Sequence, residues 1–245
     1  MTDAEQQRPS ALIFGARNLG KAIIELLLQR GWSVVGVARS QETLQGITAA
    51  GALALQADVT DQASVREAIT QTVSTHGRID LVVNAASAYG GKRSGPFGGG
   101  PMAEADADAF DSWASAPARS AFGFLSGAAG YLMQHDVTAT LIQVTGGSAR
   151  RAMPARGLWA AGAFGVRAIT QAAAQELRPH GIHVALLIVD AGIEPLSGGA
   201  RAGSSHDALA DPRGLAEAVL YLAEQGPRAV THELQVTPLA ETWLP

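Results

Sequence analysis

The chain has 245 residues, of which 47% are hydrophobic and 16% charged, and its formal net charge is −4. This composition excludes a disordered chain and fits one large α/β domain with a substantial core. The lack of a Lys or Arg cluster argues against a nucleic-acid partner, and the lack of Cys excludes disulfides, thiol nucleophiles and Cys-bound metals.

The first ten residues, Met1 to Ser10, form a polar, mildly acidic tail without the apolar segment of a signal peptide. No apolar run along the chain approaches the roughly 20 residues that a transmembrane helix needs. We therefore expect a cytoplasmic protein without a membrane partner.

Short aliphatic runs alternate with amphipathic stretches along the whole chain. The aliphatic runs predict strands at Ala11–Phe14, Val34–Ala38, Ala52–Gln56, Leu81–Asn84, Thr140–Thr145 and Val184–Val189. The amphipathic stretches predict helices at Lys21–Arg30, Gln41–Ala50, Asp61–Thr75, Ala105–Gln134 and Leu158–Leu177. Strands that are apolar on both faces and separated by helices predict a doubly wound parallel sheet.

Three segments are predicted to lie outside these elements. Residues 89–100 form a Gly-rich loop that carries Lys92, and residues 195–210, rich in Gly and Ser, are expected to act as a short substrate lid. Residues 238–245 form a C-terminal tail. No linker divides the chain.

The first predicted strand leads into a glycine turn that is typical of dinucleotide binding. Gly15 and Gly20 stand five residues apart, as the outer glycines of a G-x-G-x-x-G turn do, but Arg17 replaces the middle glycine. We expect phosphate binding at the following helix N-terminus, which includes Asn18 and Leu19, to be perturbed but not abolished.

The second predicted strand ends in Arg39 and Ser40. An acidic residue here would bind the ribose hydroxyls of NAD, whereas an arginine suits the 2′-phosphate of NADP, and Arg17 is placed to assist. NADP(H) is therefore the expected cofactor, and a solvated arginine at a strand end is the alternative.

Several later motifs, taken in order, resemble the short-chain dehydrogenase/reductase family over essentially the whole chain. Ala57-Asp58-Val59-Thr60 is similar to the step that contacts adenine, and Asn84-Ala85-Ala86-Ser87 is a variant of the family's Asn-Asn-Ala-Gly. Leu141 to Ser148 resembles the strand that ends in the catalytic Ser, and Thr231 to Val236 resembles the last strand.

This resemblance implies a single Rossmann-like domain, residues 1–245, with about seven strands flanked by helices. It also implies that a dinucleotide is bound by Gly15, Arg17, Asn18, Leu19, Gly20, Arg39, Ser40, Asp58, Val59, Asn84, Ala85 and Ala86. The family pairs its long helices into dimers or tetramers, which would here be Ala105–Gln134 and Leu158–Leu177.

The four catalytic positions of the family are all altered. By spacing, the family's Asn falls on Pro117, its Ser on Gly146, its Tyr on Trp159 and its Lys on Ala163. An indole N–H donates a hydrogen bond but does not titrate, so the usual proton donor is lost. Pro117, inside a predicted helix, should kink that helix.

Two other residues are candidates for the proton donor. Tyr89, with Lys92 three residues later, follows the fourth strand, and the alternative for both is an exposed loop. Asp190 follows the sixth strand, where it would act as a base or bind a substrate group, unless it is only a turn or cap acceptor. Glu194 is a similar but weaker candidate.

The expected substrate pocket consists of Thr145, Gly146, Ser148, Trp159 and Asp190. Trp159 would stack on nicotinamide or line an aromatic pocket, or serve as core packing. Arg150 and Arg151 are expected to be a solvated loop pair, and the alternative is that they hold a substrate carboxylate through bidentate contacts. The six histidines show no metal-ligand spacing, so no metal is expected.

Three functions remain open at this point. The first is an atypical NADP(H)-dependent oxidoreductase acting on a small carbonyl or enone compound, with the proton from Tyr89, Asp190 or water. The second is a non-redox lyase, cyclase or isomerase on the same scaffold. The third is a catalytically inactive nucleotide-binding or partner protein.

Overall fold

The computed structural model describes residues 8–86, 95–196 and 206–241. Its main sheet has seven parallel strands in the order β3-β2-β1-β4-β5-β6-β9. The strands are β1 (Ser10–Phe14), β2 (Ser33–Ala38), β3 (Leu53–Gln56), β4 (Leu81–Asn84), β5 (Thr140–Gly146), β6 (His183–Val189) and β9 (Glu233–Val236). The predicted doubly wound, Rossmann-like architecture is confirmed.

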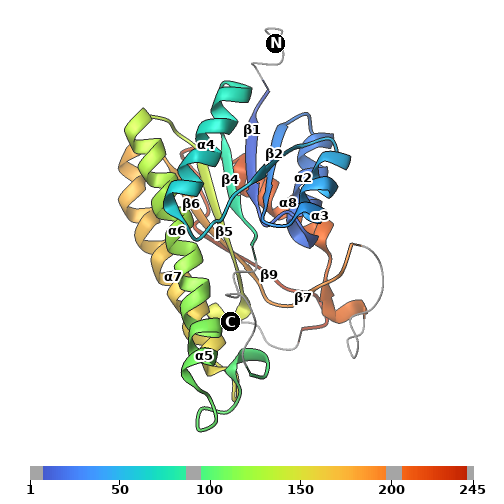
Figure 1. Cartoon of the computed structure of the whole chain (residues 1–245), viewed down its shortest axis with the longest axis vertical. Coiled ribbons are helices and arrows are strands. Elements are labelled where there is room, and N and C mark those ends of the chain that lie inside the picture. The colour runs from blue at the N-terminus through green and yellow to red at the C-terminus, as the bar shows by residue number, and fades with distance from the viewer. Residues whose placement is uncertain (1–7, 87–94, 197–205, 242–245) are drawn as a thin grey trace.

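Helices cover both faces of this sheet (Figure 1). One face carries α2 (Asn18–Gln29), α3 (Gln41–Ala49) and α8 (Pro212–Ala223), and the other carries α4 (Gln62–His76), α6 (Ala116–His135) and α7 (Gly157–Leu177). The described residues contain no helix that is long and apolar enough to cross a membrane.

The strands are buried on both faces because successive side chains point to opposite sides of a sheet. Along β1, Ile13 packs in the core beneath α2 and α8, whereas its neighbours Leu12 and Phe14 pack in the core beneath α4 and α6. This arrangement explains why the strand sequences read as continuous aliphatic runs.

Ser10, expected at the end of the polar tail, is the first residue of β1 and is fully buried. Its backbone N–H donates to Asp80 Oδ2 at 2.8 Å, and its hydroxyl donates to the Arg78 carbonyl. Serine is tolerated at this buried position because its backbone N–H and its hydroxyl both have hydrogen-bond partners.

The long helix predicted at Ala105–Gln134 is present over residues 107–135, but its hydrogen-bonding pattern changes within it. It consists of a short α5 (Ala107–Phe110), a π-helical turn at Asp111–Ser115 and then α6. The irregular turn directly precedes Pro117, which has no N–H to donate to the Trp113 carbonyl. The distortion that Pro117 predicted is therefore present at that point of the helix.

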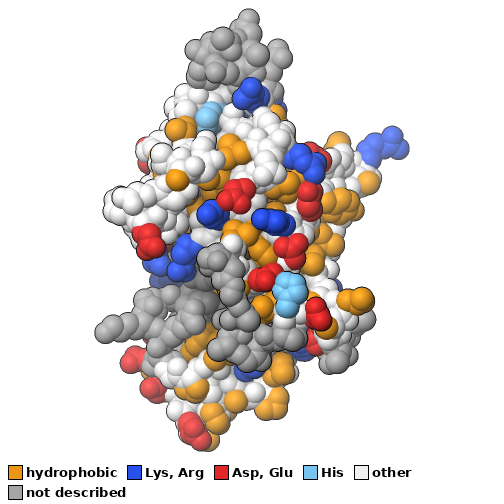
Figure 2. All heavy atoms as spheres, turned by 90° about the vertical axis from the view of Figure 1, so that its right-hand side faces the viewer, with side chains coloured by type: hydrophobic (Ala, Val, Ile, Leu, Met, Phe, Trp, Pro, Cys, Tyr) orange, Lys and Arg blue, Asp and Glu red, His pale blue; other side chains and the backbone are white. Residues whose placement is uncertain are grey.

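The end of β6 is followed by a second, two-stranded parallel sheet. It pairs β7 (Gly192–Ile193) with β8 (Leu209–Ala210), so it joins the two ends of the expected lid segment. Residues 197–205, the middle of that segment, lie outside the described residues. On the side of the molecule that Figure 2 shows, acidic and basic side chains are interspersed rather than gathered by sign.

Candidate active site

The turn between β1 and α2 is shaped by two close backbone approaches. Gly15 has φ +83°, and a Cβ atom there would lie 2.4 Å from Ala86 Cα. A Cβ atom at Gly20 would lie 2.4 Å from the Gly15 carbonyl oxygen. Both positions therefore require glycine. Gly15 is needed for its positive φ and for its close approach to Ala86, and Gly20 is needed only for its close approach to the Gly15 carbonyl.

The N-terminus of α2 opens onto this turn. Arg17 is exposed at the N-cap position, makes no capping hydrogen bond with its side chain, and the first helical turn contains no acidic residue. The unpaired amides and the positive end of the helix dipole favour an anion there. These residues fit a dinucleotide phosphate, although the middle glycine of the motif is missing.

Asn18 has a role that the sequence did not reveal. Its Nδ2 donates to the Glu194 carbonyl at 2.8 Å, and its Oδ1 accepts from the Leu196 N–H at 2.9 Å. The side chain thus fastens the segment after β7 to the glycine turn. Leu19 and Val59 have buried side chains, so any contact of theirs with a dinucleotide would use backbone atoms.

Arg39 follows β2 at the outer part of the same edge. Its side chain is 68% exposed, with Nη1 3.9 Å from Asp58 Oδ2. Ser40 caps α3 by accepting from the Thr43 N–H at 3.3 Å. The arginine is therefore the group at this end of the strand that suits a 2′-phosphate.

Asn84, expected to contact the cofactor, is fully buried at the end of β4. Its Nδ2 donates to Gln143 Oε1 at 2.9 Å and lies 3.4 Å from Ser120 Oγ, and its Oδ1 accepts from the Ala86 N–H at 3.1 Å. These bonds tie β4 to β5 and α6 and fix the backbone of Ala86 beside Gly15.

An aromatic cluster occupies the position where the Tyr and Ser were expected. A Cβ atom at Gly146 would lie 3.6 Å from the Trp159 indole nitrogen. The Trp159 indole stacks on Trp113, with ring centroids 5.6 Å apart, and its ring centroid lies 4.1 Å from that of Phe97. Ala163, one helical turn later, is buried. Positions 159 and 163 therefore carry an indole and a methyl group, not a phenol and an ammonium group.

Asp190 brings an ionisable group against the turn that follows β5. It is 7% exposed, and a Cβ atom at Gly147 would lie 1.7 Å from its Oδ1. Its carboxylate accepts from Arg151 Nη2 and from Gln235 Nε2, each at 3.3 Å. Burial raises the pKa of Asp190, Arg151 opposes that rise, and Glu241 adds to it.

Thr145 and Ser148 flank Gly146 and Gly147 and are half-buried. The expectation of a solvated arginine pair is wrong. Arg151 is 20% exposed and lies near Asp190 and Glu241, and Arg150 is 30% exposed and 3.8 Å from Glu233. Tyr89 and Lys92 lie outside the described residues.

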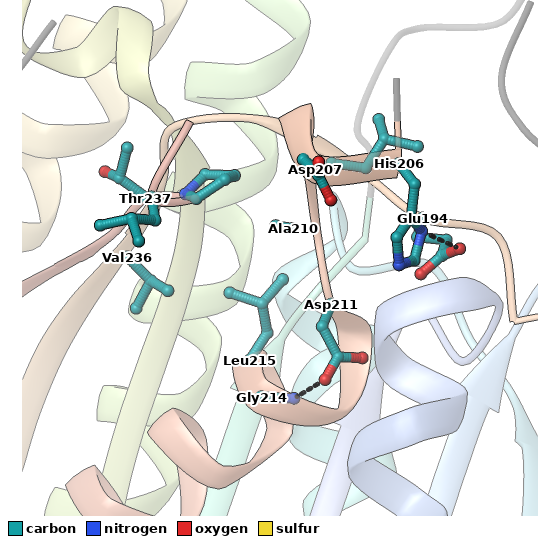
Figure 3. A pocket seen from close by; sticks show the side chains of 12 residues that line it. Glu194, His206, Asp207, Ala210, Asp211, Gly214, Leu215, Val236 and Thr237 are labelled. Atoms are coloured by element: carbon teal, nitrogen blue, oxygen red, sulfur yellow. Dashed lines mark hydrogen bonds and ion pairs between the residues drawn. The ribbon is translucent and has the colours of Figure 1, made fainter. Parts of the chain in front are cut away.

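A pocket of about 370 Å³ lies on the α8 side of this edge (Figure 3). It is bounded by the β7–β8 pair, the start of α8 and the residues after β9. Glu194 lines it and pairs with His206 at 3.1 Å, and Asp211 lines it while capping α8 through the Gly214 N–H. The carboxylate of Glu194 is thus engaged by His206 at the margin of this pocket (Figure 3).

The family model described as short chain dehydrogenase matches residues 10–192. The chain belongs to this family. The matched range contains the glycine turn, Trp159 and Asp190, whereas Gln235 and Glu241 lie beyond it.

Individual relatives agree with this assignment. A short-chain dehydrogenase/reductase homolog, YusS of Bacillus subtilis, is 42% identical over 80 residues, which are 30% of this chain and 73% of that protein. An uncharacterized oxidoreductase of Staphylococcus aureus is 26% identical over 237 residues, covering 94% of this chain and 96% of that protein.

Among solved structures, ElxO with NADP bound superposes with a TM-score of 0.78 at 20% identity, covering 94% of this chain and 97% of that one. This likeness shows that the short-chain dehydrogenase fold is shared.

Proposed function

We propose that this short-chain dehydrogenase is an NADP(H)-dependent oxidoreductase that acts on a small carbonyl or enone compound without a Tyr–Lys pair. The observation that carries the proposal is the buried carboxyl group of Asp190, which abuts Gly147 beside the altered catalytic positions. Family membership supports the reaction type, and the glycine turn supports a dinucleotide.

The preference for NADP(H) rests on Arg39. Its exposed guanidinium follows the second strand, where a 2′-phosphate is recognised in dinucleotide-binding folds. ElxO, a structural relative, holds NADP. The glycine turn at Gly15 and the amides at the start of α2 would bind the pyrophosphate.

Reduction of a carbonyl or enone needs a hydride and a proton. NADPH supplies the hydride when it is bound. Asp190 would hold the proton, because burial raises its pKa above the ordinary value of a carboxyl group, although Arg151 opposes that rise. Trp159 would donate a hydrogen bond from its indole N–H or form an apolar wall, and the hydroxyls of Thr145 and Ser148 would bind substrate oxygen.

The first test is a calorimetric titration with NADPH, with NADH as the control. Selective binding of NADPH justifies a turnover screen on carbonyl and enone compounds, in which Asp190→Asn should lower kcat by about 100-fold, the contribution typical of an acid catalyst. The matched control is Glu217→Gln, which removes an exposed carboxylate paired with Arg30 on the opposite side of the fold. Turnover that is unchanged in the Asp190 variant contradicts the assigned proton donor.

A non-redox enzyme on the same scaffold is the second candidate. It is favoured by the aromatic cluster of Phe97, Trp113 and Trp159, which replaces the polar catalytic groups with ring surfaces. Turnover without a change in cofactor absorbance would support it. Failure to bind either dinucleotide, together with no turnover, would leave the inactive partner protein.

We also propose that the protein assembles through α6 and α7 as a dimer or tetramer. Both helices lie at one side of the molecule (Figure 1) and expose large apolar side chains: Phe122 is 51%, Met133 48% and Phe164 43% exposed. Phe164→Glu should reduce the mass measured by light scattering to that of a monomer, and a wild-type chain that is already monomeric would contradict this.

A further inference from the structure

The end of the molecule that carries α5 packs around a hydrophobic cluster of its own. This cluster joins α5 and the π-helical turn to the start of α7, and its buried members are Ala109, Trp113, Ala114 and Leu158. A short helical turn at Phe97–Gly99 also contacts α7. Figure 1 shows α5 at the lower end of the molecule, below the sheet. Side chains that face outward here therefore lie outside the two main cores.

Large hydrophobic side chains are exposed at this end. Their exposed fractions range from 41% to 68%, and they belong to Phe97, Met102, Phe110 and Met153. Phe97 lies under the Arg156 guanidinium carbon, 5.2 Å from its ring centroid, and the Met153 carbonyl accepts from the Arg156 N–H. A Cβ atom at Gly157 would lie 2.9 Å from Met102 Cε. Because monomeric proteins rarely expose contiguous apolar patches, this concentration around the start of α7 indicates a contact surface.

The same end of the molecule is acidic. Residues 95–118 contain no Lys or Arg, and their four carboxylates belong to Glu104, Asp106, Asp108 and Asp111. All four residues are exposed, and none forms an ion pair with a described residue. Their combined charge of −4 equals the formal net charge of the whole chain, so the other charged residues cancel one another.

We propose that these four hydrophobic and four acidic side chains form a docking surface, the α5 surface, for a basic amphipathic segment of a partner protein. Apolar side chains of the partner would cover the exposed Phe and Met residues, and its Lys or Arg side chains would pair with the acids. Methionine suits such a surface because its flexible thioether adapts to the shape of a ligand. The proposal does not depend on the oxidoreductase reaction.

The charge of the α5 surface favours this partner over two other occupants. A second copy of the chain docked by a two-fold axis would bring the four carboxylates of each copy against one another, which is unfavourable. An anionic membrane surface would be repelled by the same acids. A basic segment with an apolar face is complementary to both the charged and the apolar parts of the surface.

The probe is a short, fluorescently labelled peptide of Leu and Lys whose leucines recur every three or four residues, titrated into the full chain and followed by anisotropy. An isomer with its leucines grouped at one end is the control peptide. Phe110→Ser should weaken binding of the probe by about tenfold, because an apolar anchor is lost. Leu53→Ser, which removes a 46% exposed side chain from β3 at one edge of the sheet, should leave binding unchanged.

A second variant tests the acids. Glu104→Gln combined with Asp108→Asn should weaken binding by about fivefold at low salt and should reduce its salt dependence, because exposed charge pairs are screened by ions. Both side chains are exposed and outside the hydrophobic cluster, so the fold should be retained. The matched control is Glu176→Gln, which removes an exposed acid near the opposite end of α7 and should have no effect.

The proposal is overturned if the probe does not bind, or if the isomer binds equally well. It is also overturned if Phe110→Ser and Leu53→Ser have the same effect, since the peptide would then bind elsewhere. A fall in the mass measured by light scattering for Phe110→Ser would assign the surface to a second copy of the chain instead. Failure of NADPH to bind would remove the redox function and leave this proposal in place.

Discussion

The turns after β1 and after β5 lie at the same edge of the sheet, and each contains a glycine that leaves no room for a Cβ atom. Gly15 lies against the backbone of Ala86, whereas Gly147 lies against the carboxylate of Asp190. The first turn therefore depends on backbone shape and the second on a particular side chain.

The two turns therefore differ in what a change of side chain would affect. The β1–α2 turn and the helix N-terminus are formed with an arginine in place of the middle glycine, because their shape depends on Gly15, Gly20 and backbone amides. Proton transfer needs a titratable side chain, and at the β5 turn Gly146, Trp159 and Ala163 provide none. On the proposed function, the nucleotide region is retained while Asp190 takes over the proton transfer.

The largest expected effect comes from breaking the second turn alone. In Gly147→Ala the new Cβ atom would lie 1.7 Å from Asp190 Oδ1 and would push that carboxylate off Arg151. Loss of a buried ion pair together with overpacking should cost about 4 kcal/mol in the free energy of unfolding.

The matched control is the adjacent Gly146→Ala, whose Cβ atom would make an ordinary 3.6 Å contact with Trp159 and should cost less than about 1 kcal/mol. Urea denaturation of both variants measures the difference. Equal costs would mean that Asp190 is not fixed where the structure has it.

Gly15→Ala breaks the first turn in the same manner. Alanine at φ +83° would be strained, and its Cβ would clash with the Ala86 backbone. The combined cost should be about 3 kcal/mol, with loss of NADPH binding. Gly31→Ala has nearly the same φ, +82°, but open space around the Cβ atom, so it should cost about 1 kcal/mol from strain alone and leave NADPH binding intact.

Arg39→Ala tests the selectivity of the nucleotide region for NADPH, and it should not disturb the fold because Arg39 is exposed. Loss of a guanidinium from a 2′-phosphate should weaken NADPH binding by about tenfold and leave NADH binding unchanged. Arg30→Ala, which also removes an exposed, ion-paired arginine, should affect neither ligand. Equal weakening of both dinucleotides by Arg39→Ala would remove its role in selecting NADP(H).

The smallest expected effect is a pH dependence of stability that distinguishes two carboxylates on neighbouring strands. Burial raises the pKa of Asp190 in the folded state, so its contribution favours folding at low pH and is lost as pH rises from about 3.8 through the raised value. Burial also acts to raise the pKa of Glu233, but hydrogen bonds from Arg167 and Gln171 outweigh it and lower that pKa below 4.5.

Stability contributed by Glu233 is therefore present above pH 4.5 and is lost as pH falls through its lowered value. The measurement is the difference in unfolding free energy between the wild type and Asp190→Asn, and between the wild type and Glu233→Gln, across this range. The two differences should change with pH in opposite directions. Parallel changes would contradict the assigned pKa shift of Asp190.

Much of the fold could be predicted because its signals are local. The β4 strand lies at Leu81–Asn84 as expected, and the predicted helices α2, α3, α4 and α7 differ from the observed ones mainly by a few residues at their ends. The π-helical turn at Asp111–Ser115 was not predicted, since proline indicates that a helix is distorted but not how the preceding turn re-pairs its carbonyls.

The candidate site was less accessible to prediction. Gln143 and Ser120, which hold Asn84, were missed, although a polar residue inside an aliphatic strand was a usable signal. Gln235 and Glu241 were missed, and no local pattern could have indicated them, because both are brought close to the Arg151–Asp190 pair by packing between segments far apart in the sequence.

The sequence by itself determined the parallel sheet and the glycine turn that begins α2, because periodicity and glycine spacing are both read from neighbouring positions. Only the tertiary structure decided that Trp159 stacks on Trp113, and that Arg151 joins Asp190, 39 residues away, to the tail acid Glu241. Those contacts depend on which strand ends meet at one edge of the sheet and on where their side chains point, and long-range packing sets both.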